Sequence, residues 1–358
     1  MKNSPLFGHV YCFLPYNLSC PSARYRAYFP LSNLLESGQL TVDFMQPSAS
    51  WKKRIAFLCI YLEALIWPKK NSRIFIQKVC STRYYGYLLR FLVFCRPNIS
   101  FFDLDDAENY RQPTQNMHFF LRKAKACSLG SQALKDYALA FNANCRIHTS
   151  AVPQQNLQTG PKHQVLRLVW LGDLGDGRKK SKAFSHKTNV YSLLFPALKK
   201  LQFPIELHLL GVKKKSDIPE IQAYFASSPH IHLVIPQDLN WVEDDWVYTY
   251  LSKMDLGLAP LVDHPFNQAK SAFKAKQYLA VGLPVLASDI GENSRFVQED
   301  KNGFLFRNEA ELLQQLAFFQ KVDAEQMQAF QRAAKTSFQE FSMARYEQQL
   351  LNMLFEVD

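Results

Sequence analysis

Residues Asp255–Phe304 read DLGLAPLVDHPFNQAKSAFKAKQYLAVGLPVLASDIGENSRFVQEDKNGF and indicate the fold more clearly than any other stretch of the 358-residue chain. The apolar run Met254–Pro260 predicts a buried strand, and a polar loop follows it. We expect a helix from about Ser271 to Gly282, after which Pro284 begins a second buried strand. Strand, loop, helix and strand in this order are typical of a parallel α/β unit, whose helix begins at the carboxyl edge of the sheet.

The start of this helix is a candidate anion site, because a helix N-terminus presents unpaired N–H groups and the positive end of a dipole. Lys270, Lys274 and Gln277 are spaced i, i+4, i+7, which predicts one shared helix face. The hydroxyl of Ser271 lies beside Lys270 at the mouth of the site. Two lysines and several amides suit a diphosphate, and an amide one turn deeper suits a ribose diol. The alternative is that both lysines lie on a solvated face and Gln277 is incidental.

Short apolar strands alternate with helices along the whole chain. In the first half, helices are expected near 24–37, 52–66, 82–95 and 131–142, the last with Ser131 as its cap, between the strands Gly8–Leu14, Leu40–Gln46, Arg73–Gln77, Asn98–Asp103, Ala126–Leu129 and Cys145–Thr149. In the second half, helices are expected near 188–201, 218–226, 243–253, 271–281 and 292–299, between the strands Val165–Leu171, Ile205–Gly211, His230–Ile235, Met254–Pro260, Pro284–Ser288 and Gly303–Phe306.

A polar segment with Pro and Gly, residues 151–163, separates the two halves. We therefore predict an α/β fold with two Rossmann-like, doubly wound parallel-sheet domains, 1–155 and 164–335, that face a central cleft. Such folds bind ligands at the carboxyl edges of their sheets. The chain is expected to be mostly helical from Glu309 onward, with 336–358 as its last segment.

Composition excludes several classes of protein. Hydrophobic residues make up 47% and charged residues 20%, which is typical of a globular chain. The longest apolar run, Ile55–Trp67, has 13 residues and contains Glu63, whereas a membrane span needs ~20. Residues 1–20 lack the features of a signal peptide, so we expect a cytoplasmic protein. The seven cysteines form no CxxC pair, and the nine histidines lack metal-ligand spacing apart from His230 and His232, which we interpret as surface packing residues. We therefore expect reduced, mostly buried thiols and no metal site.

The net charge of +11 lies entirely in the first half of the chain. Residues 1–160 hold 19 Lys and Arg against 8 Asp and Glu, whereas residues 161–358 hold 23 of each. Such one-sided charge predicts an anionic partner, such as a lipid surface, a nucleic acid or a phosphorylated substrate. Because the basic half contains no nucleic-acid motif, we do not expect a nucleic acid.

Residues 51–70 read WKKRIAFLCIYLEALIWPKK, an apolar segment with basic residues and a tryptophan at both ends. A strand follows directly, which favours a buried crossover helix of the first domain. The basic ends are nevertheless suited to an anionic membrane surface, where each such residue contributes ~1 kcal/mol. Peripheral association with the cytoplasmic membrane face is therefore a second hypothesis for this half.

The segment from Asp255 to Phe306 resembles the donor half of group 1 glycosyltransferases with the GT-B fold, of the retaining family 4 kind. The pattern consists of DLGLAPL at a strand end, KS..K.., an aromatic residue, A.GLPVLAS..G and NGFLF. Here it is carried by Asp255–Leu261, Lys270, Ser271, Lys274, Gln277, Tyr278, Ala280, Gly282–Ser288, Gly291 and Asn302–Phe306. Many such enzymes have two glutamates eight positions apart, of which the second binds the donor ribose. Ala269 and Gln277 occupy these positions here, and only Gln277 can hydrogen-bond a hydroxyl.

The resemblance continues upstream, where Leu166–Asp173 reads LRLVWLGD and resembles the first strand and tight turn of the donor domain. It implies that Gly172 and Asp173 lie at the donor site, and Lys187, near the start of the next helix, is a second phosphate candidate. We interpret the basic run 175–187 as a solvated loop. Trp241 is interpreted as a packing residue rather than a platform for the base.

In the first domain, the segment 21–38 resembles the S.R.R segment of a subset of these transferases and follows the first strand. Arg24 and Arg26 are spaced i, i+2, which places them on different faces, so we expect one of them to meet phosphate and favour Arg24. The alternative is that one or both cover the helix surface.

Three carboxylates crowd the end of the fourth strand at Asp103, Asp105 and Asp106. Like charges this close raise at least one pKa, which suits a group that handles a proton. Asp103 and Asp105 are therefore candidate catalytic residues, together with Lys274. The DxD string also suggests Mn²⁺ or Mg²⁺, but GT-B enzymes generally stabilise the diphosphate with amides and lysines, so no metal is expected. A competing interpretation is that Asp105 or Asp106 caps the next helix.

The resemblance implies transfer of a sugar from a nucleoside-diphosphate sugar, UDP or GDP, to a hydroxyl of a glycan or lipid-linked acceptor. It implies retention of configuration, no tightly bound cofactor, and a last helix, about Met343–Phe355, that packs on the first domain. The expected setting is the assembly of bacterial surface polysaccharide or glycoconjugate. The alternatives are a nucleotide-sugar epimerase on the same fold, or a non-catalytic module that uses the basic half for binding.

Overall fold

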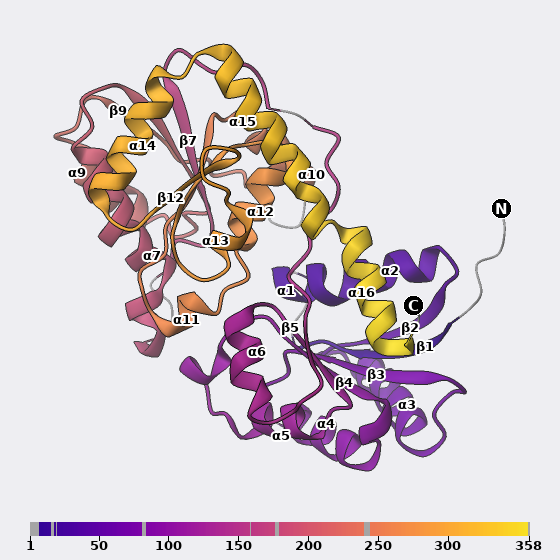
Figure 1. Ribbon diagram of the computed structural model, residues 1–358. Helices are drawn as coiled ribbons and strands as arrows, with labels where there is room; N and C mark the ends of the chain where they lie inside the picture. The colour runs from indigo at the N-terminus through magenta and orange to yellow at the C-terminus, as the bar shows by residue number, and fades with distance from the viewer. Residues whose placement is uncertain are drawn as a thin grey trace. The chain divides into compact units, whose positions relative to one another are not determined.

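The computed structural model describes residues 7–15, 18, 20–80, 84–157, 159–175, 179–239 and 244–356 (Figure 1). Its contacts divide the chain into two units, each with its own six-stranded parallel sheet. Unit 1 comprises Met1–Ala151, Ala269–Ser271 and Phe341–Asp358, and unit 2 comprises Val152–Gln268 and Ala272–Glu340. The predicted α/β class with two doubly wound parallel sheets is confirmed.

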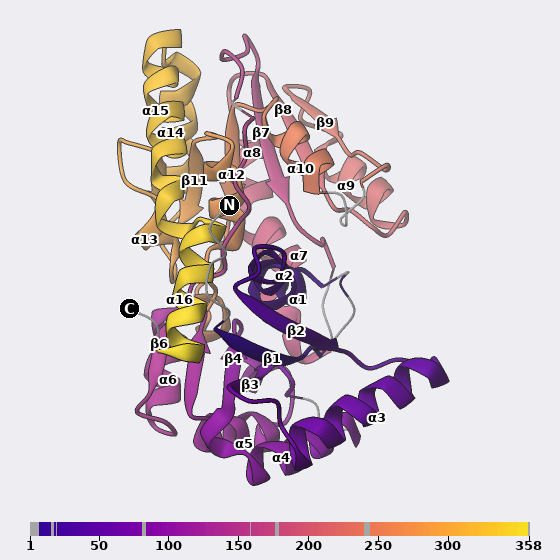
Figure 2. The same cartoon turned by 90° about the vertical axis from the view of Figure 1, so that its right-hand side faces the viewer.

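Unit 1 has the strand order β2-β1-β3-β4-β5-β6. The strands are β1 (Gly8–Phe13), β2 (Leu40–Met45), β3 (Ser72–Gln77), β4 (Ser100–Leu104), β5 (Ala126–Leu129) and β6 (Cys145–Ile147). The helices are α1 (Pro21–Ala23), α2 (Phe29–Glu36), α3 (Trp51–Ile66), α4 (Tyr84–Cys95), α5 (Gln115–Lys123), α6 (Gln132–Leu139) and α16 (Met343–Phe355). Helices α3, α4 and α5 cover one face of the sheet, while α2 and α16 lie on the other (Figures 1 and 2).

The C-terminal helix α16 belongs to unit 1 by its contacts, although it ends the chain. Glu347 accepts a hydrogen bond from Asn33 of α2 at 2.6 Å. The Tyr346 hydroxyl donates to the backbone oxygen of Arg26 at 2.9 Å, and Arg73 of β3 donates to the oxygen of Leu354 at 2.5 Å. These bonds span the whole sequence and fix the last helix on the α2 side of the sheet.

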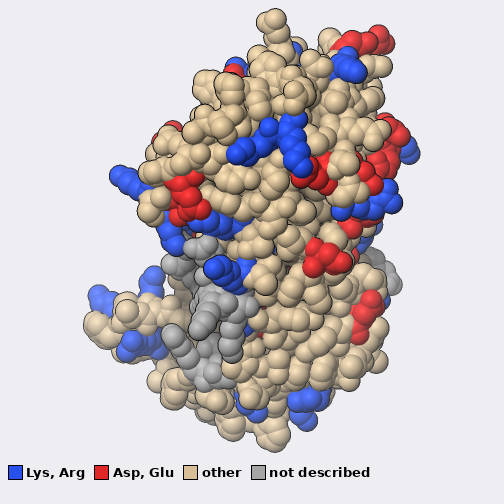
Figure 3. Space-filling model, turned by 90° about the vertical axis from the view of Figure 1, so that its left-hand side faces the viewer, with Lys and Arg blue, Asp and Glu red and all other residues tan. Residues whose placement is uncertain are grey.

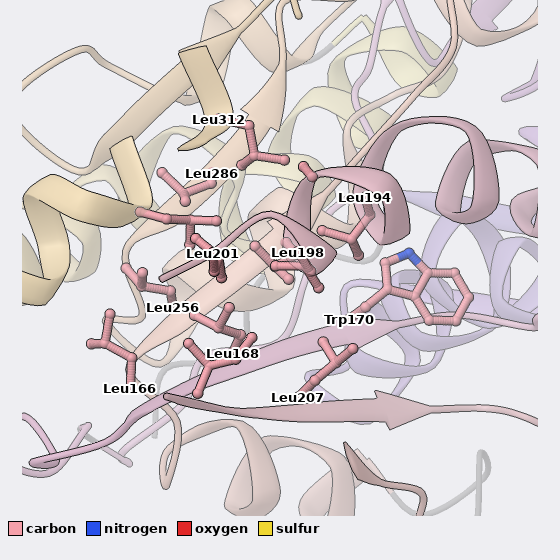
Figure 4. Packing of buried hydrophobic residues seen from close by; sticks show 14 of the residues in the cluster. Leu166, Leu168, Trp170, Leu194, Leu198, Leu201, Leu207, Leu256, Leu286 and Leu312 are labelled. Atoms are coloured by element: carbon pink, nitrogen blue, oxygen red, sulfur yellow. The ribbon is translucent and has the colours of Figure 1, made fainter. Parts of the chain in front are cut away.

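Unit 2 has the strand order β12-β11-β10-β7-β8-β9, which in reverse is the order of a dinucleotide-binding fold. The strands are β7 (Leu166–Leu171), β8 (Ile205–Leu210), β9 (Ile231–Val234), β10 (Leu256–Ala259), β11 (Val285–Ser288) and β12 (Gly303–Phe306). The helices are α7 (His186–Asn189), α8 (Phe195–Lys199), α9 (Asp217–Phe225), α10 (Asp244–Leu251), α11 (Pro265–Gln268), α12 (Phe273–Ala280), α13 (Asn293–Phe296), α14 (Glu309–Lys321) and α15 (Ala324–Ser337). Leucines from β7, β8, β10, β11 and the flanking helices form its apolar core, with Trp170 at one end (Figure 4).

All twelve predicted strands are present, with bounds that differ by at most two residues at either end. Ser131 caps α6 as expected, because its hydroxyl accepts from the Leu134 amide. Two helices were not predicted, α5 and the four-residue α11. In α5 only four of nine residues are buried, so its apolar signal is weak and a polar segment precedes it.

Helix α3 connects β2 to β3 as predicted, but the expectation that this crossover helix is buried is wrong. Only Tyr61 and Ala64 of its sixteen residues are buried. No helix in the described part of the chain is long and apolar enough to cross a membrane. All seven cysteines are free thiols, and four of them are buried.

Candidate functional site

The strand order of unit 2 reverses direction between β7 and β10, which is where open α/β sheets bind ligands. Gly172 directly follows β7 at this point. A Cβ atom at Gly172 would lie 2.8 Å from Cε of Lys274 and 3.0 Å from the Trp170 ring. The absence of a side chain at Gly172 therefore leaves the space in which Lys274 lies against the end of the strand.

Lys274 is the basic residue of α12 that the fold brings to this strand end. Its ammonium group lies 5.8 Å from the centre of the Trp170 ring, and Nζ is 3.3 Å from Nδ1 of His186. His186 begins a helical segment that Ser185 caps, because the Ser185 hydroxyl accepts from the Thr188 amide at 3.0 Å. A cation, an imidazole and a helix start converge here, which is an arrangement suited to an anion.

Tyr278 fixes α12 against the sheet. Its hydroxyl accepts from the Leu171 amide at 2.9 Å and donates to the Leu258 oxygen at 3.2 Å, so it bridges β7 and β10. A Cβ atom at Gly257 would lie 2.4 Å from the Tyr278 ring, so only glycine admits the ring this close. Burial raises the pKa of Tyr278, which keeps the phenol protonated as a donor. One rigid aromatic residue thus sets the position of Lys274 one turn earlier.

The expected shared helix face of Lys270, Lys274 and Gln277 is wrong. Helix α12 begins at Phe273, and Ala272 before it has a left-handed backbone with φ of 52°. Lys270 and Ser271 therefore precede the helix, and their contacts assign them to unit 1, whereas Lys274 and the buried Gln277 belong to unit 2. The left-handed residue turns the chain, so the i, i+4 rule does not hold across it.

In unit 1, the hydroxyl of Ser271 lies 3.2 Å from that of Ser150. Burial lowers the pKa of Lys270 to about 8. The negative charge of Asp106 raises this pKa, and the positive charge of Arg111 lowers it. The diphosphate-binding roles of Lys270 and Ser271 and the ribose-binding role of Gln277 remain predictions.

Polar side chains shape the loop that follows β10. Oδ1 of Asn189 accepts from the Val262 amide at 2.9 Å, and Asn267 donates to the Val262 oxygen at 2.9 Å. Gly291, with φ of 57°, donates its amide to Oε1 of Gln268 at 3.0 Å. Nδ1 of His264 accepts from the Phe266 amide at 3.0 Å. The loop before α12 is thus held by its own side chains and by the helical segment after β7.

Asp173 and Lys187 lie in ion pairs of unit 2. Asp173 pairs with Lys213 at 3.0 Å on the surface, and Lys187 pairs with Glu220 at 2.8 Å. The proposed roles of Gly172, Asp173 and Lys187 at the donor remain predictions, and the residue of this segment that contacts Lys274 is His186. Sequence reasoning missed His186, although it lies within the basic run 175–187 and directly precedes Lys187. Trp241 lies outside the described residues.

At the carboxyl edge of unit 1, Asp103 forms a buried ion pair with Arg26. Arg26 donates to both Asp103 oxygens, at 2.5 and 2.9 Å, and Ser128 donates to the same carboxylate at 2.7 Å. Neither side chain of the pair is exposed. Asp103 thus has a structural partner on each oxygen, and its catalytic role remains a prediction that this geometry does not favour.

Lys78 organises the other carboxylates of this edge. It directly follows β3, and its Nζ lies 3.0 Å from Asp105, 2.6 Å from Asp106 and 3.2 Å from Glu108. The expectation that Asp105 or Asp106 caps the next helix is wrong, since the described caps of the two following helical segments have no side-chain bond. Sequence reasoning missed Lys78, whose only signal is its place after a buried strand.

The two neighbouring aspartates differ in acidity. Burial raises the pKa of Asp105. The charge of Lys78 lowers this pKa, whereas the charge of Asp106 raises it further. Burial acts on Asp106 too, but the charges of Lys78 and Arg111 outweigh it and lower its pKa. The prediction that one carboxyl has a raised pKa therefore holds for Asp105, with burial as the larger cause. Its use as a catalytic proton carrier remains a prediction.

Arg24 and Arg26 are both buried, so the alternative that they cover the helix surface is wrong. Arg24 donates to the Leu18 oxygen at 2.8 Å, and its phosphate-binding role remains a prediction. Across the described ranges, no three His, Cys, Asp or Glu side chains are grouped so as to hold a metal ion.

Several solved structures have the same fold as the chain. Anabaena Alr3699/HepE in complex with UDP is 14% identical with a TM-score of 0.63, over 98% of this chain and all of that one. Sucrose-phosphate synthase from Thermosynechococcus elongatus is 11% identical with a TM-score of 0.69, over 96% of this chain and 98% of that one. The lipopolysaccharide outer core galactosyltransferase WaaB is 11% identical with a TM-score of 0.60, over 98% and 99%.

Curated protein sequences give no significant match to the chain. Residues 166–319 match the family described as "Glycosyl transferases group 1", and this segment contains Gly172, His186, Lys274 and the Tyr278 bridge. The resemblance predicted from the motifs is therefore confirmed. Residues 166–319 form a group 1 glycosyl transferase domain, in a chain that has the GT-B fold.

Proposed function

We propose that the chain transfers a glycosyl group from a UDP-sugar to a hydroxyl of an acceptor. The observation that carries this proposal is the position of Lys274, against Gly172 at the end of β7 and 3.3 Å from His186. UDP is preferred to GDP because the similar Anabaena protein was crystallised with UDP and with UDP-glucose.

The chemical demand of the reaction is the negative charge that develops on the leaving diphosphate. Lys274 supplies a fixed positive charge for it, and the start of the capped helical segment at His186 supplies backbone N–H groups. Retention of configuration is implied by the resemblance to the retaining family. Asp105, whose pKa is raised, is the candidate proton carrier in unit 1.

The acceptor is proposed to be a glycan or a lipid-linked saccharide in bacterial surface polysaccharide or glycoconjugate assembly. The similar WaaB is a lipopolysaccharide outer core galactosyltransferase, which supports this class of acceptor. The proposed place of action is the cytoplasmic face of the membrane.

A thermal-shift screen of UDP, GDP, ADP, TDP and CMP tests the donor, because a ligand that binds the native state raises the melting temperature. We expect the largest rise with UDP. Lys274→Ala should abolish it, while Lys301→Ala, which changes an exposed lysine of the same unit, should retain it. A UDP shift that survives Lys274→Ala would remove this residue from the site.

A second measurement distinguishes transfer from other chemistry at the same site. UDP-sugars incubated with and without mixed glycan acceptors are analysed for UDP release and for new glycosides. Acceptor-dependent UDP release supports transfer. Epimerisation of the donor in the absence of any acceptor would replace the proposal with an epimerase.

A further inference from the structure

Exposed apolar side chains are concentrated on two neighbouring helices of unit 1. Fourteen large hydrophobic residues are exposed among the described part of the chain, and ten of them lie between residues 51 and 94. These ten are Trp51, Ile55, Leu58, Leu62, Ile66, Trp67, Tyr84, Tyr87, Phe91 and Phe94. They belong to α3, α4 and the residue after α3, and we call them the α3–α4 apolar surface. Scattered exposed apolar residues are ordinary, whereas a concentration of this kind marks an interaction site.

The exposed residues of α3 form a continuous stripe. Positions 51, 55, 58, 62 and 66 advance by three or four residues, which places them on one face of the helix. On α4, positions 84, 87, 91 and 94 have the same spacing and are exposed in the same way. Both helices therefore have two apolar faces, one that packs on unit 1 and one that is exposed to solvent.

The inner faces of the two helices pack together, so that the helices lie side by side. The Tyr61 hydroxyl of α3 donates to the Leu88 oxygen of α4 at 3.0 Å. The ring of Phe57 lies 5.6 Å from that of Tyr85 and 6.2 Å from Phe13 of β1. Because these contacts fix the inner faces, the exposed stripes of both helices belong to one rigid surface.

The charge around this surface is strongly positive. Residues 51–96 contain ten Lys and Arg and one acidic residue, Glu63. Glu63 accepts from the Tyr11 hydroxyl at 2.5 Å and pairs with Lys69, so its charge is used within the unit. The first turn of α3 carries the exposed Lys52, Lys53 and Arg54. Figure 2 shows this end of α3 projecting from the rest of unit 1, and the same projection carries Lys and Arg side chains at the lower left of Figure 3.

We propose that the α3–α4 apolar surface docks on an anionic lipid membrane. An apolar helix face bordered by Lys and Arg, with tryptophan at its ends, is the pattern of a helix that lies in the membrane interface. Trp51 and Trp67, 66% and 78% exposed, are at the two ends of α3. The apolar stripes enter the acyl boundary, and the basic residues contact lipid phosphates.

The positive charge around the α3–α4 apolar surface favours an anionic membrane, rather than a second copy of the chain, as the partner that binds it. Two copies that meet through this surface would bring together two regions that each carry the exposed Lys52, Lys53 and Arg54, and the one acidic residue within 51–96, Glu63, is already paired within the unit. An anionic bilayer offers both a negative surface and an apolar interior. The proposal rests on unit 1 alone and does not depend on the proposed glycosyl transfer.

Flotation of the full chain with vesicles tests the proposal. At low salt, the protein should float with phosphatidylcholine vesicles that contain phosphatidylglycerol and should remain unbound with phosphatidylcholine alone. Leu58→Glu with Phe91→Glu changes the apolar surface, and Lys52→Glu with Lys53→Glu changes its basic border. We expect each pair to weaken binding by roughly tenfold or more.

The matched control is Leu139→Glu with Phe318→Glu, which changes two exposed apolar residues outside this surface and should bind as the unmodified chain does. Urea unfolding of every variant checks the fold, and the thermal shift with UDP checks the donor site separately. Loss of flotation with an intact UDP shift supports the proposal, whereas failure of the UDP shift alone counts only against glycosyl transfer.

Two outcomes would overturn the membrane proposal. One is equal flotation of the Leu58→Glu and Phe91→Glu variant and the unmodified chain. The other is a dimer by light scattering that dissociates in the same variant while no vesicle binding occurs, which would make this surface an interface between copies.

Discussion

The two parallel sheets have the same number of strands but are held by different forces at their carboxyl edges. In unit 1 the edge contains buried charge, with Arg26 paired to Asp103 and Lys78 in contact with three carboxylates. In unit 2 the edge depends on close packing, since the Tyr278 ring fits against Gly257 and Lys274 fits against Gly172. The basic half of the chain is thus also the half in which buried ion pairs hold the carboxyl edge of the sheet.

This difference separates stability from ligand binding. Removal of one partner from a buried ion pair leaves an uncompensated charge, so unit 1 is sensitive to single charge changes. In unit 2 the position of Lys274 depends on Gly172, Gly257 and Tyr278. Substitutions that change the size of a side chain should therefore affect the binding site in this unit. Three predictions test whether charge and shape are divided between the units in this way.

The largest effect is expected for Arg26→Met. This change leaves the Asp103 carboxylate buried without its cation and should lower the free energy of unfolding by about 3–5 kcal/mol. Urea unfolding measures it, with the exposed Arg122→Met as the control. If the variant fails to fold, adding Asp103→Leu should restore folding, because the charge that remained is removed. A loss of less than about 1 kcal/mol would contradict the dependence of unit 1 on this pair.

A pH effect of intermediate size is expected from His148, which is buried beside Arg26. Burial, with the charge of Arg26, lowers its pKa to about 4. The unfolded chain therefore binds one more proton between pH 6.5 and 4, and stability falls as the pH falls through this range. The loss attributable to His148 is about 3 kcal/mol when complete.

His148→Phe, which keeps a ring beside Tyr346, should flatten this part of the stability–pH curve. Urea midpoints at pH 7 and pH 4.5 measure the change, and the exposed His232→Phe is the matched control. Parallel curves for the His148 variant and the unmodified chain would show that this histidine does not cause the acid sensitivity.

The smallest effect is expected in unit 2 for Gly257→Ala. The added methyl group would lie 2.4 Å from the Tyr278 ring, and the overpacking should cost about 1–3 kcal/mol. Gly160→Ala is the control, since a Cβ there has no neighbour within 4 Å. Because Tyr278 positions α12, the UDP shift should decrease as well. Equal melting temperatures for the two variants would show that unit 2 tolerates changes of shape at this site.

The sequence by itself determined the strands, the class of the fold and the crossover helices other than α5. Short apolar runs and helical spacing depend on neighbours along the chain, and these patterns are visible without a structure. The same holds for Lys274, whose place one turn before Tyr278 follows from helix geometry alone. The turn at Ala272 was not visible, because an alanine gives no sign of a left-handed backbone, and it separated Lys270 from the helix face predicted for it.

Only the tertiary structure decided which charged residues meet. Arg26 and Asp103 are 77 positions apart, and Lys78 reaches Asp105 because β3 and β4 are neighbours in the sheet. The tertiary structure also determined that α3 is exposed, because the same apolar sequence can pack against a neighbour or remain at the surface. Local periodicity records which side of a helix is apolar, but contacts between distant segments determine what each side touches.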